Sequence, residues 1–139
     1  MKQFHLMFTV MIAAILGCSE TTSEEQSSRP GDESGWLISF AEAKAKSAEE
    51  GKPILMEFTG SDWCPPCMAL HDNVLTSDVF KQQIPEKFIL LKLDSPRDKS
   101  KQTPEEIPQY KKLSAAYKIR GVPTIMVADA TGREKHRQV

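Results

Sequence analysis

Two cysteines separated by two residues are the part of this sequence best suited to chemistry. Cys64 and Cys67 lie in the run DWCPPC (62–67), where a short apolar segment meets helical spacing. Two intervening residues bring both sulfurs within disulfide range across one helical turn. Because a helix N-terminus favours the thiolate, we expect Cys64 to be the nucleophile and Cys67 the thiol that resolves a mixed disulfide. The pattern indicates a redox-active dithiol.

Other uses of such a pair fit less well. The chain has three cysteines, an odd number that argues against a disulfide-stapled scaffold. A structural zinc site needs four ligands, and the pair supplies two. Haem attachment needs a histidine directly after the second cysteine, where Met68 stands instead. We therefore expect no metal at this site, with a merely structural pair as the remaining alternative.

The N-terminus has the features of an export signal. Lys2 precedes an uncharged run at 6–16, which is too short to cross a bilayer of ~30 Å but suits the core of a signal peptide. The run ends in Gly17-Cys18, which resembles the bacterial lipobox. We expect residues 1–17 to be a signal peptide and Cys18 to be lipidated, the alternative being ordinary cleavage beside an incidental cysteine. Ser19 favours outer-membrane sorting in a Gram-negative cell.

The segment after this cysteine differs from the rest of the chain. Residues 19–35 contain no aliphatic or aromatic side chain, so they cannot bury enough surface to fold. We expect 18–35 to be a lipidated cysteine with a disordered tether and 36–139 to be the folded domain. The protein would then be a lipoprotein anchored on the periplasmic side of a membrane. A net charge of −1 gives no indication of a nucleic-acid partner.

The folded part must place the two cysteines where a strand meets a helix. The capping-box pattern from Ser39 to Glu42 predicts a helix that ends at Gly51. The order αβαβαββ predicts an α/β fold with a mixed sheet and helices on both faces. Apolar patterning predicts further helices at 67–75 and 108–118 and strands at 54–58, 88–93, 124–128 and 133–139, the last one antiparallel.

Two motifs together resemble those of a known family. The run WCPPC (63–67) resembles the active site of thioredoxins, and GVPT (121–124) resembles their cis-proline loop. The similarity covers 36–139 and implies the thioredoxin fold with a mixed four-stranded sheet. The run 58–64 and the charged loop 95–108 are most similar to periplasmic thiol–disulfide reductases and isomerases of the DsbH type. That fold closes with a C-terminal helix, which this chain would lack.

The resemblance implies roles for individual residues. Pro123 in cis would turn the backbone of Val122 toward the sulfurs, where it can pair with an extended substrate segment. Trp63 would shield the disulfide on one side. Glu57 matches the buried acid that takes the proton from the resolving cysteine. Its spacing to Cys64 is one residue longer than usual, so a partly solvated strand residue is the alternative.

We therefore expect an enzyme that needs no cofactor and reduces or isomerises disulfides in exported proteins. Its electrons would come from a membrane or periplasmic donor. The alternative is a non-enzymatic module of the same fold, a chaperone or a copper-delivery protein that uses the two thiols as soft ligands. His136 is the candidate for a further ligand in that case.

Overall fold

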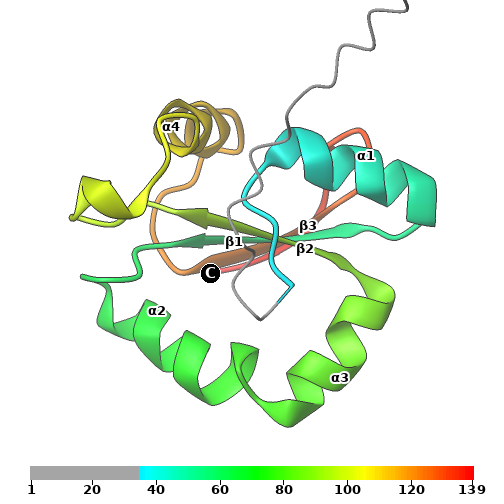
Figure 1. Ribbon diagram of the computed structural model, residues 1–139, viewed down its shortest axis with the longest axis horizontal. Helices are drawn as coiled ribbons and strands as arrows, with labels where there is room; N and C mark the ends of the chain where they lie inside the picture. Colours follow the sequence, from blue (N-terminus) through cyan, green and yellow to red (C-terminus); the bar gives the residue numbers. More distant parts are fainter. Residues whose placement is uncertain (1–34) are drawn as a thin grey trace, which may run out of the picture.

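The computed structural model describes residues 35–139, which fold around one mixed four-stranded sheet (Figure 1). The strand order is β2-β1-β3-β4, with β2 parallel to β1, and with β1 and β4 both antiparallel to β3. The predicted signal peptide, Cys18 and most of the tether lie outside the described residues. The elements are α1 (Phe40–Glu50), β1 (Ile54–Thr59), α2 (Pro65–Leu70), η1 (His71–Leu75), α3 (Asp78–Lys87), β2 (Ile89–Asp94), η2 (Lys99–Lys101), α4 (Glu106–Ala116), β3 (Thr124–Ala128) and β4 (Glu134–Gln138).

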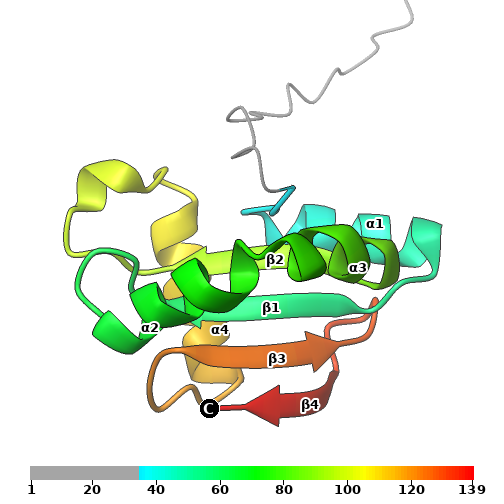
Figure 2. The same ribbon diagram turned by 90° about the horizontal axis from the view of Figure 1, so that it is seen from below.

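Helices cover both faces of the sheet, as the sequence predicts. Helices α1 and α4 lie on one face, and α2 and α3 lie on the other (Figures 1 and 2). Side chains alternate along a strand, so Met56 and Phe58 of β1 enter the main core with Leu113 of α4. Leu55 points the opposite way and packs with Leu75 in a second cluster. The central strand β1 is therefore buried on both faces.

The ends of α1 follow the predicted capping signals. The Ser39 side chain accepts a hydrogen bond from the backbone N–H of Glu42 at 3.3 Å. Gly51 ends the helix at a φ of +67°, a left-handed conformation in which a side chain would be strained. This boundary fixes where β1 begins, three residues later.

The segment between the second predicted helix and the second predicted strand contains a helix that the patterning did not predict. In α3, the Ser77 side chain accepts from the N–H of Phe80 at 3.2 Å. Phe80 and Ile84, four residues apart, pack beside Trp36, whose ring stacks on Phe80 with centroids 6.1 Å apart. Pro85 lies inside this helix. The packing of Phe80 and Ile84 therefore outweighs the tendency of Pro85 to end a helix.

The remaining boundaries shift by one or two residues. The predicted helix 67–75 begins earlier, at Pro65, and its last five residues form the π-helical turn η1. The predicted helix 108–118 begins at Glu106 and ends at Ala116. The last strand is antiparallel to β3, as predicted. Within residues 35–139, no helix combines the length and the apolar character needed to cross a bilayer.

Candidate redox site

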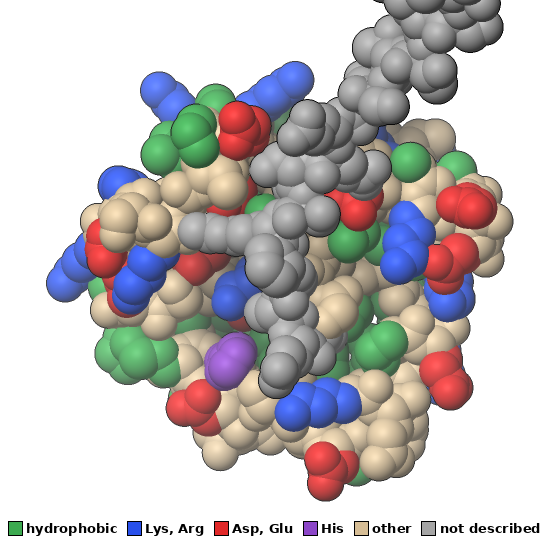
Figure 3. All heavy atoms as spheres, in the orientation of Figure 1, with side chains coloured by type: hydrophobic (Ala, Val, Ile, Leu, Met, Phe, Trp, Pro, Cys, Tyr) green, Lys and Arg blue, Asp and Glu red, His purple; other side chains and the backbone are tan. Residues whose placement is uncertain are grey.

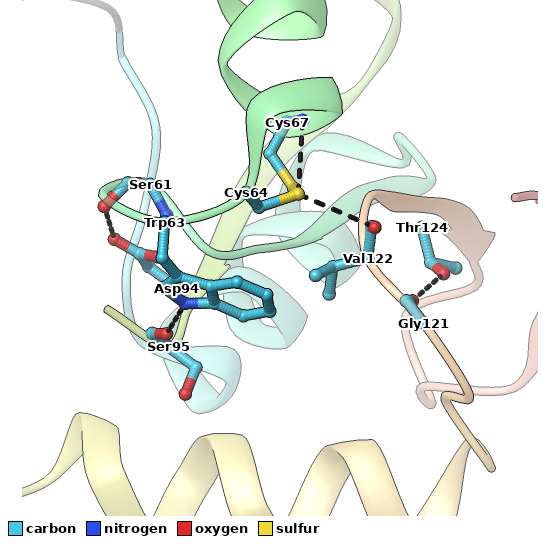
Figure 4. The surroundings of a disulfide bond; sticks show 9 residues. All are labelled: Ser61, Trp63, Cys64, Cys67, Asp94, Ser95, Gly121, Val122 and Thr124. Atoms are coloured by element: carbon cyan, nitrogen blue, oxygen red, sulfur yellow. Dashed lines mark hydrogen bonds between the residues drawn. A yellow bond between two sulfur atoms is a disulfide. The ribbon is translucent and has the colours of Figure 1, made fainter. Parts of the chain in front are cut away.

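Cys64 and Cys67 form a disulfide at the start of α2, with their Cα atoms 5.2 Å apart (Figure 4). Both are buried, at 3% and 1% exposure. Cys64 is the N-cap of the helix, and the backbone N–H of Cys67 donates to its sulfur at 3.3 Å. Pro65 and Pro66 fill the first two helical positions and have no N–H to donate. The sulfur of Cys64 thus meets one backbone donor from the first three helical residues.

The loop before β3 faces this disulfide. The peptide bond between Val122 and Pro123 is cis, which confirms that expectation. The carbonyl oxygen of Val122 lies 3.6 Å from the sulfur of Cys64 (Figure 4). The two segments meet because Phe58, near the end of β1, pairs with Thr124, the first residue of the antiparallel strand β3. Sheet topology therefore brings together residues that lie 58 positions apart.

Trp63 stands beside the disulfide, with its indole ring on the side away from α2 (Figure 4). Its ring N–H donates to the carbonyl of Ser95 at 2.8 Å, and its side chain is 37% exposed. The ring lies so close to Gly60 that a Cβ there would be 2.4 Å from ring carbon Cε2 of Trp63. The carbonyl of Gly60 also accepts from the N–H of Cys64 at 3.0 Å. Gly60 therefore makes room for the ring that flanks the redox pair.

Glu57 is buried at 2% exposure, so the alternative of a partly solvated strand residue is wrong. It points to the face of β1 opposite Phe58, which is the face covered by α2. Burial raises the pKa of Glu57, while Lys92 on the neighbouring strand and a hydrogen bond with Thr59 act in the opposite direction. A buried carboxyl group on the same face as the helix of Cys67 is suited to exchanging a proton there.

A network that the sequence analysis did not identify surrounds the turn before Cys64. The carboxylate of Asp62 accepts from the backbone N–H groups of Arg97 at 2.8 Å and Asp98 at 3.1 Å, which hold the pKa of Asp62 below its usual range. The N–H of Ser61 donates to Asp94 at 3.0 Å. Run 58–64 and the charged loop 95–108 were both singled out in the sequence. Only the structure shows that they touch.

The residues proposed for a copper-delivery role are not gathered in one place. Residues 35–139 contain no cluster of three or more histidine, cysteine, aspartate or glutamate side chains able to hold a metal ion. His136 is exposed on β4, where it pairs with Val127. Val127 in turn pairs with Leu55, near the start of β1. The two cysteines are bonded to each other beyond the opposite end of β1.

Comparisons with known proteins match the chain to one family. A family model described as thioredoxin-like matches residues 35–130. The chain is 36% identical over 99 residues to the disulfide bond reductase DsbH of Chlamydia pneumoniae, and 31% identical over 128 residues to the thioredoxin-related protein DsbJ of the same organism. These matches cover 71% and 92% of this chain but only 59% and 36% of the two relatives. The chain thus spans less than two thirds of the length of either.

Solved structures give the same result. The structure of a DsbH oxidoreductase aligns with a TM-score of 0.69 at 33% identity, covering 82% of this chain and 79% of that one. A disulphide isomerase from Xylella fastidiosa Temecula1 aligns with a TM-score of 0.54 at 26% identity, covering 69% and 67%. The mixed four-stranded sheet with helices on both faces agrees with these matches. The chain belongs to the thioredoxin-like family.

Proposed function

We propose that this protein is a thiol–disulfide oxidoreductase that reduces or isomerises disulfides in exported proteins through Cys64 and Cys67. One observation carries the proposal. The sulfur of Cys64 lies 3.6 Å from the carbonyl oxygen of Val122. The reacting atom and a backbone segment able to pair with an extended substrate are therefore adjacent. The relatives named as a disulfide bond reductase and a disulphide isomerase support the same reaction class.

The reaction proceeds by two thiol–disulfide exchanges. The thiolate of Cys64 attacks a substrate disulfide, forms a mixed disulfide and releases one substrate thiolate. The thiol of Cys67 then loses its proton and attacks the sulfur of Cys64, which releases the second substrate thiolate and closes the disulfide. The substrate gains two electrons and the protein loses two. A membrane or periplasmic donor of thiol equivalents restores the dithiol.

Glu57 accepts the proton of Cys67 in the second exchange. Its carboxyl group is buried on the face covered by α2, and burial raises its pKa toward the range in which a carboxylate takes up a proton readily. Lys92, its partner on β2, keeps the charged form accessible. Glu57 thus supplies a base where water has little access.

The surface around the disulfide suits transient contact with protein chains. Trp63 and Met68 are large apolar side chains that remain 37% and 38% exposed. Pro65 and Pro66 are also exposed between them. Contact with the backbone at Val122 adds affinity that depends little on side-chain identity. Trp63, Val122 and Pro123 form the substrate-binding part of the site in this proposal.

The proposed location is extracytoplasmic, with the domain 36–139 tethered by residues 18–35 to a lipid on Cys18. The support comes from the sequence, since the signal-like segment 1–17 and the cysteine after Gly17 lie outside the described residues. Anchoring in the outer membrane of a Gram-negative cell belongs to the same proposal, on the strength of Ser19. A lipid anchor would hold the redox site near the membrane surface.

A trapping experiment tests the assignment of the two thiols. Cys67→Ser leaves the nucleophile but removes the thiol that resolves the mixed disulfide, so it should accumulate covalent adducts with exported proteins. Cys64→Ser is the matched control and should accumulate none. Adducts are read by non-reducing electrophoresis before and after reduction. Adducts with Cys64→Ser alone would reverse the two roles, and their absence from both variants would contradict the proposal.

A further inference from the structure

Residues 94–102, here called the clamped loop, are fixed to the segment that precedes Cys64. The N–H of Ser95 donates to the carbonyl of Thr59 at 3.0 Å, and the side chain of Gln102, only 8% exposed, donates to the carbonyl of Asp94 at 2.8 Å. Asp62 accepts two backbone hydrogen bonds from the loop and forms an ion pair with Lys101 at 3.5 Å. The backbone of this loop is therefore held in place beside the redox pair.

The acids of the clamped loop are engaged within the fold. The carboxylate of Asp94 binds the N–H and hydroxyl of Ser61. The carboxylate of Asp98 binds the N–H and hydroxyl of Ser100 at 3.0 and 2.7 Å. Together with Asp62 these acids carry as many negative charges as the loop carries positive ones, but each carboxylate is held by donors within the fold.

Two cations of the clamped loop, Arg97 and Lys99, differ from Lys101, which pairs with Asp62. Arg97 is exposed, and its guanidinium lies 5.8 Å from the centre of the Trp63 ring. Lys99 contacts only the neutral side chains of Ser95 and Gln102. Within residues 35–139, neither Arg97 nor Lys99 forms an ion pair with a carboxylate. Figure 3 shows Lys and Arg side chains, with Asp and Glu side chains among them, at the edge of the molecule where η2 lies.

The loop on the other side of the redox pair carries two further cations. Lys118 and Arg120, both exposed, line an open cavity of about 580 Å³ that extends from the Val122 loop toward β4. Glu134 is the one acidic side chain among the described residues that line it, and it is paired with Arg137 at 2.7 Å. Lys118 and Arg120 have no carboxylate partner in the described part of the chain.

These two segments lie on either side of the turn that bears Cys64, at one end of the sheet (Figure 2), and each has an arginine without a carboxylate partner among the described residues. We propose that the redox site selects disulfides whose cysteine is flanked by acidic residues, with carboxylates meeting Arg97 on one side and Arg120 on the other. The inference rests on the proposed function and adds its substrate class. Guanidinium groups bind carboxylates through paired hydrogen bonds, and complementary charge raises the rate of encounter. Backbone pairing at Val122 would hold the segment extended between them.

Three synthetic peptides that differ only in the residues flanking one disulfide provide the test. The flanks are glutamate, glutamine or lysine, and the readout is the second-order rate constant for oxidation of the reduced protein at low salt. We expect the glutamate peptide to react about five- to tenfold faster than the lysine peptide, with glutamine between them. At 0.5 M salt, where charges are screened beyond about 4 Å, the three rates should converge.

Charge-reversal variants assign the effect to particular residues. Arg97→Glu with Arg120→Glu should reverse the order of the three peptides, while Lys81→Glu, a matched change on exposed α3, should leave it intact. Equal rates for all three peptides, or an order that survives the double reversal, would overturn this inference. If the reduced protein oxidises with none of the peptides, the proposed function itself fails, which is a different result.

Discussion

The sulfur of Cys64 accepts from the backbone N–H of Cys67, and Pro66→Ala should give it a second backbone donor. An N-cap side chain accepts from the second or third helical N–H. Cys67 is the third position, 3.3 Å away, and the second is Pro66, which has no N–H. A hydrogen bond to a charged group contributes ~1.5–3 kcal/mol, more than one to a neutral acceptor, so a second donor stabilises the thiolate more than the neutral disulfide sulfur. Since ~30 mV corresponds to 1.4 kcal/mol, the potential should become more positive, by at most about 30–60 mV.

Equilibration with glutathione buffers, with the oxidised fraction read by thiol alkylation, measures this shift. Pro65→Ala is the matched control, because the first helical N–H is not one that the N-cap side chain accepts. The wild-type potential should lie on the thioredoxin side of about −200 mV, because the prolines leave the thiolate few donors. An unchanged or more negative potential for Pro66→Ala, or an equal shift for Pro65→Ala, would refute the argument.

Three further substitutions test other parts of the account. Burial raises the pKa of Glu57, so between the pKa of the unfolded chain and that of the folded protein the native state holds a proton that the unfolded chain has released. The free energy of unfolding therefore falls as pH rises through this range. Glu57→Gln should abolish this fall in urea titrations and slow the resolving step on the order of 10²-fold, whereas an unchanged rate would remove Glu57 from the mechanism. Gly60→Ala should place a Cβ 2.4 Å from the Trp63 ring and destabilise the fold by about 1–3 kcal/mol, measured by chemical unfolding; no loss would mean that the ring relaxes freely. Cys18→Ala should move the protein out of the membrane fraction or block its processing, and a wild-type protein that is not membrane-bound would contradict lipidation.

The strands could be predicted from sequence because their signals are local. Segments such as 124–128 are short apolar runs between turn residues, and the structure has β3 at the same residues. Helix α1 is capped by Ser39 and ends at Gly51, so the residues at its two ends are enough to predict its bounds. In helix α3 the local signals conflict, because Ser77 favours a helix start whereas Pro85 favours a helix end. Its stripe of Phe80 and Ile84 becomes informative only when Trp36, far away in sequence, packs against it.

The same distinction holds for the candidate site. The cysteine pair and the cis-proline motif are contiguous patterns, and the structure brings them within 3.6 Å. The hydrogen bonds between Asp62 and the clamped loop join residues 35 positions apart. Their donors are backbone N–H groups, which the residue types do not reveal. The burial of Glu57 could not be decided either, because it depends on how α2 covers its face of the sheet.

Reduction of insulin disulfides in the presence of dithiothreitol tests the central claim most directly. The protein should accelerate the appearance of precipitated insulin B chain over dithiothreitol alone. Cys64→Ser should abolish the acceleration while leaving the protein folded, which the far-UV circular dichroism spectrum checks. An absence of acceleration by the wild-type protein, or full activity of Cys64→Ser, would contradict the assignment of Cys64 and Cys67 as a catalytic dithiol.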